Sequence, residues 1–163
     1  MRKFFIKFLS SCCFLGYIPF ASGTFGTLAG ILMVWLTYYF IDINLLSGKL
    51  IYLFLCIFLT LISIPISTQA EILYNKKDSS KIVLDEAVSF FITMFWLPFN
   101  LKIVIVGFIL NRIFDIIKIE PARSFQNKFR AGWGVVLDDT VSAFYSNILL
   151  RIIIFLTGNF FFS

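Results

Sequence analysis

Long apolar runs separated by short polar segments divide this chain into five hydrophobic segments. The two longest early runs approach the roughly 20 apolar residues that a helix needs to cross a bilayer, and a polar turn between them predicts a helical hairpin. We therefore predict an all-α fold, a small polytopic membrane helical bundle, built as a single domain over residues 1–163. The predicted membrane segments are residues 25–41, 50–66, 87–97, 103–117 and 136–156.

The polar sequence Pro98–Lys102 separates the third segment from the fourth. Proline disfavours a helical residue before it and lacks an amide donor, so we predict a turn here. Both flanking segments are short for a full crossing at about 1.5 Å of rise per residue, and we expect them to be partly buried in protein. The alternative is a single kinked span over residues 88–110, which would leave the acidic residues near its ends on opposite sides of the membrane.

Positive charges fall unequally on the two sides of the membrane that this segmentation defines. The side with the N-terminus and residues 67–81 and 118–134 carries ten Lys and Arg residues, whereas the side with residues 42–49 and 98–102 carries two. Basic residues favour the cytoplasmic side of a membrane protein. We therefore predict a multi-pass protein of the inner (cytoplasmic) membrane, with the first side facing the cytoplasm.

The composition supports a membrane protein and limits its chemistry. Hydrophobic residues make up 60% of the chain and charged residues 14%, against about 25% charged in soluble domains. The net charge of +5 suits anionic lipid, and because the chain has no long basic stripe we expect no nucleic-acid partner. There is no histidine, and the three cysteines lie in apolar surroundings, where they are expected to act as small hydrophobes.

The first residues of the chain resemble a signal peptide, and the sequence from Leu9 to Cys12 resembles a lipoprotein cleavage box. Lys7 interrupts the apolar stretch, however, and the hydrophobic pattern continues through Ile18. We therefore predict that the N-terminus is retained.

Five of the nine acidic residues stand at segment ends on the predicted cytoplasmic side. Asp85 and Glu86 open the third segment, Asp115 closes the fourth, and Asp138 and Asp139 open the fifth. The helix dipole would favour an acid at a helix start, but it explains neither the doublets nor Asp115 at a helix end. Carboxylates that converge without histidine or thiolate form an oxygen site suited to Mg²⁺.

A glycine-rich segment precedes the first predicted span on the same side. Gly23 and Gly26 permit close backbone approach, while the hydroxyls of Thr24 and Thr27 and free amides at the helix start suit a phosphate group. Glycines at the entry to a membrane helix also serve helix packing, so both interpretations remain open.

At these residues the sequence resembles the phosphatidylglycerophosphatase A family, membrane phosphatases that convert phosphatidylglycerophosphate to phosphatidylglycerol. Three blocks carry the resemblance: residues 19–28 (PFASGTFGTL), the doublet at 85–86, and residues 112–139, which include RIFDIIK, Pro121, RAGWG and a second acidic doublet. The chain departs from the family pattern at Ser22 and Ile119, where proline is usual, and at Ser89, where glycine is usual.

The resemblance implies a magnesium-dependent phosphomonoesterase that acts on a lipid at the cytoplasmic face. On this basis Mg²⁺ binding and water orientation are assigned to Asp85, Glu86, Asp115, Asp138 and Asp139. Phosphate binding is assigned to Thr24, Thr27, Arg112, Lys118 and Arg130. Other phosphatase chemistries lack their residues, because the chain has no Cys-x5-Arg sequence, no histidine and no Asp-x-Asp sequence.

Two other classes of function remain as alternatives. Acidic clusters also form cation pathways, although the first two spans offer few polar side chains for one. A non-catalytic scaffold subunit would explain the basic loops but not the paired acids. The sequence leaves open the number of metal ions, the general base, the acyl-chain preference and the oligomeric state.

Overall fold

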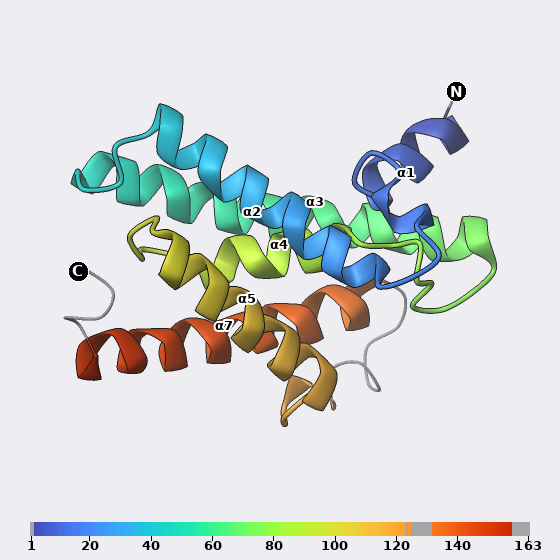
Figure 1. Ribbon diagram of the computed structural model, residues 1–163. Helices are drawn as coiled ribbons and strands as arrows, with labels where there is room; N and C mark the ends of the chain where they lie inside the picture. The colour runs from blue at the N-terminus through green and yellow to red at the C-terminus, as the bar shows by residue number, and fades with distance from the viewer. Residues whose placement is uncertain (1, 123, 125–131, 158–163) are drawn as a thin grey trace.

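The computed structural model describes residues 2–122, 124 and 132–157, and this part of the chain is helical without any β-strand (Figure 1). Its helices are α1 (Arg2–Ser10), the short 3₁₀ helix η1 (Leu15–Tyr17), α2 (Ser22–Phe40), α3 (Leu46–Tyr74), α4 (Leu84–Thr93), α5 (Leu101–Ile117) and α7 (Gly132–Leu156).

Three of these helices, α2, α3 and α7, are long and apolar enough to cross a membrane. Large apolar side chains on their outer faces are exposed, such as Phe54 and Leu61 on α3 and Ile148 on α7. Such an outer surface is stable against lipid and unfavourable in water. The predicted all-α membrane bundle is therefore confirmed.

Helix α4 occupies the centre of the bundle. It packs against α2, α3, α5 and α7, and Figure 1 shows it in the middle of the bundle. Every residue from Ala87 to Thr93 is buried. The prediction of a short segment covered by protein is confirmed, and a single kinked span over residues 88–110 is wrong, because α4 ends at Thr93 and α5 begins at Leu101.

The predicted end of the third segment at residue 97 is wrong, because α4 ends at Thr93 and a turn follows it. Two further predicted boundaries are wrong for one physical reason. Helix α3 continues to Tyr74, through residues 67–74 that were expected in a polar loop, and α7 begins at Gly132 rather than at residue 136. The two extensions contact each other: the Gly132 amide donates to Thr68 Oγ1 at 3.1 Å, and a Cβ built on Gly132 would lie 2.6 Å from the Thr68 amide nitrogen. These polar and glycine residues thus face a helix rather than water.

The connecting segments gather at two ends of the bundle. At one end, Trp96 Nε1 donates to the Lys49 carbonyl at 3.2 Å, and the Tyr38 hydroxyl donates to the Leu97 carbonyl. At the other end, the Val83 amide donates to the Ser10 carbonyl at 2.9 Å. We call this second end, where α2 and α4 begin and α5 ends, the acidic end. Helices α2, α4 and α7 begin at the acidic end, and α3 and α5 end there (Figure 1).

Candidate active site

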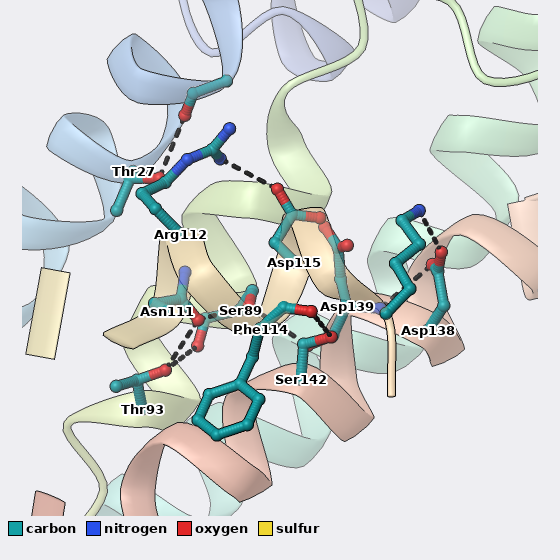
Figure 2. A network of polar contacts seen from close by, with 12 residues as sticks. Thr27, Ser89, Thr93, Asn111, Arg112, Phe114, Asp115, Asp138, Asp139 and Ser142 are labelled. Atoms are coloured by element: carbon teal, nitrogen blue, oxygen red, sulfur yellow. Dashed lines mark hydrogen bonds and ion pairs between the residues drawn. The ribbon is translucent and has the colours of Figure 1, made fainter. Parts of the chain in front are cut away.

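The acidic residues singled out from the sequence meet at the acidic end. Asp85 and Glu86 lie in the first turn of α4, Asp115 lies near the end of α5, and Asp139 projects from α7. Each of these carboxylates interacts electrostatically with at least two of the others. Figure 2 shows Asp115 and Asp139 pointing toward each other. We call these four residues the carboxylate cluster. Asp138 and Asp139 stand in the second turn of α7 rather than at its opening, because the helix begins earlier than predicted.

The first two members of the cluster are held in a water-poor environment. Burial raises the pKa of Asp85 well above its ordinary range, and the adjacent charge of Glu86 raises it further. Burial also raises the pKa of Glu86, to about 8. Since each ionised form is costly here, the pair favours a bound proton or a cation.

The free oxygens of the cluster fit a hard cation. Asp85 Oδ1 and Glu86 Oε2 are buried and have no hydrogen-bond partner among the described residues. Within the same residues, no group of three or more His, Cys, Asp or Glu side chains is arranged to hold a metal ion. Mg²⁺ commonly uses only one or two carboxylates, with waters and substrate phosphate oxygens as its other ligands, so a closed cage is not required.

Arg112 and the start of α2 border the cluster. Arg112 Nη1 lies 3.1 Å from Asp115 Oδ2, yet it makes no hydrogen bond within the described structure. A Cβ built on Gly23 would lie 2.6 Å from Glu86 Oε1 and 2.9 Å from Arg112 Nη2. Gly23 therefore allows α2 to begin against the carboxylate cluster.

The two threonines of the glycine-rich segment have different environments. Thr27 is fully buried, and its hydroxyl donates to the Gly23 carbonyl at 2.9 Å (Figure 2). The Thr24 side chain is half-buried, but its amide donates to the Ala21 carbonyl at 2.8 Å. The expectation of a free amide at Thr24 is therefore wrong, because the first turn of α2 already uses it.

Lys118 and Asp138 form a separate ion pair at the edge of the cluster. Lys118 Nζ lies 2.5 Å from Asp138 Oδ2, and the Asp138 side chain is 1% exposed. Burial alone would lower the pKa of Lys118, but the hydrogen bond to Asp138 and its charge raise it overall, so Lys118 stays protonated. Both residues are thus engaged with each other, while the predicted phosphate ligand Arg130 lies outside the described residues.

Sequence reasoning missed a polar network beneath the cluster. The Ser89 hydroxyl lies 2.9 Å from Asn111 Oδ1 and 3.1 Å from the Asp139 carbonyl, and the Thr93 hydroxyl donates to the same Asn111 oxygen (Figure 2). These bonds tie α4, α5 and α7 together directly below the carboxylates. The only sequence signal was that Ser89 departs from the family pattern.

Asp78 was also missed, because it lies in the polar segment that follows α3 and not at an end of a predicted membrane segment. Its charge acts on Asp85 and on Lys118, so it belongs to the electrostatic environment of the site. Its amide donates to Glu71 Oε1 at 2.8 Å, which fixes the loop to the end of α3.

Comparison with known proteins finds a family and several relatives for this chain. A family model described as Phosphatidylglycerophosphatase A matches residues 8–154. A Haemophilus influenzae protein named Phosphatidylglycerophosphatase A is 34% identical over 138 residues, covering 83% of this chain and 80% of its own length. The Escherichia coli protein of that name is 31% identical over 143 residues, covering 85% and 77%.

A further relative carries a different name. A Bacteroides thetaiotaomicron protein, named provisionally as a phosphatidylinositol-3-phosphatase, is 33% identical over 144 residues, covering 84% of this chain and 86% of its own. No solved structure matches the chain.

Proposed function

Since this chain belongs to the phosphatidylglycerophosphatase A family, we propose that its carboxylate cluster hydrolyses the terminal phosphate of phosphatidylglycerophosphate, releasing phosphatidylglycerol and inorganic phosphate. The cluster is the only concentration of buried carboxylates in the described part of the chain, and it lies at the end of a membrane bundle, where a lipid headgroup is found. Membrane lipid is accordingly both the surroundings and the substrate of this protein.

The proposal includes a requirement for Mg²⁺, and it rests on the unpartnered oxygens of Asp85 and Glu86. Buried oxygens without donors are costly, and a divalent cation would offset that cost. When bound, Mg²⁺ would lower the pKa of a water molecule and neutralise the phosphoryl oxygens.

Each side chain then has a distinct task. Asp85 and Glu86 would hold the cation through their free oxygens, and a carboxylate of the cluster would accept a proton from the attacking water. Arg112, whose Nη1 has no hydrogen bond within the described residues, would bind a phosphate oxygen, since a guanidinium group suits phosphate. Thr24 has a half-buried side chain at the start of α2, next to Gly23, which would place it at the headgroup. Lys118 would reach phosphate only by leaving Asp138.

We further propose that the acidic end faces the cytoplasm and that the membrane is the inner (cytoplasmic) membrane. Lysines concentrate at this end, as the positive-inside bias requires. The site would then meet its lipid substrate in the cytoplasmic leaflet.

Phosphate release from phosphatidylglycerophosphate tests the proposal. Detergent-purified protein should release inorganic phosphate with Mg²⁺ and lose this activity with a chelator. Asp85→Asn and Asp139→Asn should each lower turnover about 10²-fold or more. Asp42→Asn is the matched control, because Asp42 lies in the loop at the opposite end, where its Oδ1 accepts the Asn44 amide at 3.0 Å. Near-normal turnover in either cluster variant would remove that residue from the site.

Binding of the ion can be measured apart from catalysis. Mg²⁺ that binds the folded protein should raise its thermal midpoint, in a concentration-dependent way, by mass action. The rise should be absent in Asp85→Asn and present in Asp42→Asn. An unchanged midpoint in the wild type at millimolar Mg²⁺ would contradict a metal role for the cluster.

Substrate choice is tested in the same assay. Phosphatidylinositol 3-phosphate serves as the comparison lipid, because one relative is provisionally named for it. We expect faster release from phosphatidylglycerophosphate. Folded protein that releases phosphate from neither lipid would favour the scaffold alternative, and ion flux through reconstituted vesicles would favour the cation pathway.

A further inference from the structure

An apolar groove of about 510 Å³ lies between α2 and the segment formed by α1 and the residues that follow it. On α2 it is lined by Phe25, Ala29 and Met33, among others, and its lining also includes Cys13 and Leu84. The mechanism proposed above does not use this groove.

The groove follows the axis of a membrane-spanning helix. Its α2 residues recur every three or four positions from 25 to 33, which places them on one face over about 12 Å at 1.5 Å per residue. Helix α2 begins at the acidic end and is one of the three candidate spans. The groove therefore leads from the acidic end toward the interior of the membrane.

One end of the groove lies beside the carboxylate cluster. Leu84, in its lining, directly precedes Asp85 and Glu86 in α4. The Cys12 thiol, also in the lining, lies 3.8 Å from the Val83 carbonyl. Burial raises the pKa of this thiol to about 12, and the charges of Asp85 and Glu86 contribute to the shift, so these groups are near neighbours.

We propose that this groove holds an acyl chain of the lipid whose phosphate is bound at the carboxylate cluster. This inference rests on the proposed function and adds to it the part of the site that recognises the lipid tail. Lipid acyl chains contact the whole outer surface of the bundle. An acyl chain in this groove differs from the others because the headgroup attached to it reaches Asp85 and Glu86.

Orientation of the substrate is the expected effect of the groove. A lipid tail gains little free energy by leaving one apolar medium for another, so the groove adds little affinity. A fixed tail would instead align the phosphate with the cluster, and misalignment by about 1 Å can lower a rate roughly 100-fold. Helix α1 suits a position at the membrane surface, since it presents Lys3 together with the exposed rings of Phe4 and Phe5.

Photolabelling of the intact protein tests the proposal directly. The probe is phosphatidylglycerophosphate with a photoreactive diazirine in its acyl chain, and the control is phosphatidylcholine with the same chain. In mixed micelles with Mg²⁺, irradiated at low temperature to limit turnover, we expect the phosphatidylglycerophosphate probe to label residues 8–15 and 25–33 more than the control does. Excess unlabelled phosphatidylglycerophosphate should remove that difference. The same labelling pattern with both lipids would overturn the proposal that the groove holds the substrate's acyl chain.

A matched pair of substitutions provides a kinetic test. Ala29→Phe places a ring in the groove, whereas Leu36→Phe adds one on the same face of α2, two turns further along and outside the groove lining. Ala29→Phe should lower turnover of a long-chain substrate roughly 10- to 100-fold. It should affect a dihexanoyl substrate much less, and Leu36→Phe should match the wild type. Thermal melts establish that both variants fold.

The outcomes separate this inference from the proposed function. Suppose that the protein releases phosphate, that both lipids label the same residues and that Ala29→Phe has no effect on turnover. The phosphatase function would then stand, and the acyl-chain site would be rejected. Selective labelling without phosphate release from any lipid would retain a lipid-tail site and reject the phosphatase.

Discussion

At the scale of single residues, the side-chain oxygen of Asn111 joins α5 to α4. It accepts hydrogen bonds from the Thr93 and Ser89 hydroxyls, both at 2.9 Å, and Asn111 is 1% exposed. Ser89→Ala or Thr93→Val should each cost about 1 kcal/mol, because the other hydroxyl remains as a donor. The double variant should cost about 1–3 kcal/mol more than the sum, since the oxygen is then left unsatisfied.

Equilibrium unfolding in mixed detergent, followed by circular dichroism, measures these differences. Thr37→Val is the control, because the Thr37 hydroxyl donates to the Met33 carbonyl within its own helix, α2. If the losses in the free energy of unfolding from the two substitutions simply add, the Asn111 side-chain oxygen must have another hydrogen-bond donor.

The Lys118–Asp138 pair makes a second prediction at this scale. Lys118→Met leaves the buried Asp138 carboxylate without its cation, so we expect a clear loss of stability of about 1–3 kcal/mol. Adding Asp138→Asn should restore most of that loss, because the unpaired charge is removed. Thermal melts check stability, and the KM of the folded double variant reports whether Lys118 also binds phosphate. Failure of the second substitution to restore stability would contradict the pairing.

Acidic side chains were easier to predict than hydroxyls and amides. Five carboxylates at segment ends in an apolar chain have few structural explanations, and four of them meet in the carboxylate cluster. Ser, Thr and Asn in apolar helices are ambiguous, because they can bond to their own helix, as Thr37 and Thr60 do. Nothing local distinguishes them from Ser89 and Asn111, whose partners lie on other helices.

At the scale of elements, the closeness of α2 to α4 depends on glycine. A Cβ built on Gly26 would lie 2.7 Å from the Val83 carbonyl oxygen and 3.2 Å from Glu86 Cβ. Gly26→Ala should therefore push α2 away from the carboxylate cluster, cost about 1–3 kcal/mol and lower turnover. Gly107→Ala is the matched control, because its nearest neighbour would be the flexible end of Leu150 at 3.1 Å. Similar melts and rates for both variants would show that α2 can shift freely.

The positions of α2, α3, α4, α5 and α7 were predictable from apolar runs, but several of their ends were not. A hydropathy pattern shows which residues avoid water, and it cannot show that Thr68 and Gly132 avoid water by facing each other. The turn at residues 98–100 was predictable because proline acts locally. The glycine-rich segment remained ambiguous in sequence, since only the arrangement of α2 on α4 shows that Gly23 serves both packing and the site.

At the scale of the whole molecule, the two ends of the bundle differ in their number of basic residues. Among the residues whose side chains the structure describes, seven Lys and Arg lie at the acidic end: Lys3, Lys7, Lys76, Lys77, Lys81, Arg112 and Lys118. Three lie at the opposite end: Lys49, Lys102 and Arg151, which donates to the Phe95 carbonyl at 2.6 Å. The excess of basic residues that predicted orientation from sequence therefore persists in the folded structure, and the carboxylate cluster lies at the end that is richer in Lys and Arg.

This asymmetry predicts the labelling of single cysteines in intact cells. With Cys12, Cys13 and Cys56 replaced by serine or alanine, Ser80→Cys places a thiol in the exposed loop at the acidic end, and Ser47→Cys places one at the exposed start of α3. A membrane-impermeant maleimide added outside should label Ser47→Cys at once and Ser80→Cys only after permeabilisation. The reverse pattern would put the carboxylate cluster outside the cell, where a phosphatase could not act on lipid in the cytoplasmic leaflet. Phosphate release from each variant shows that the labelled protein is folded, so the orientation measured is that of the active enzyme.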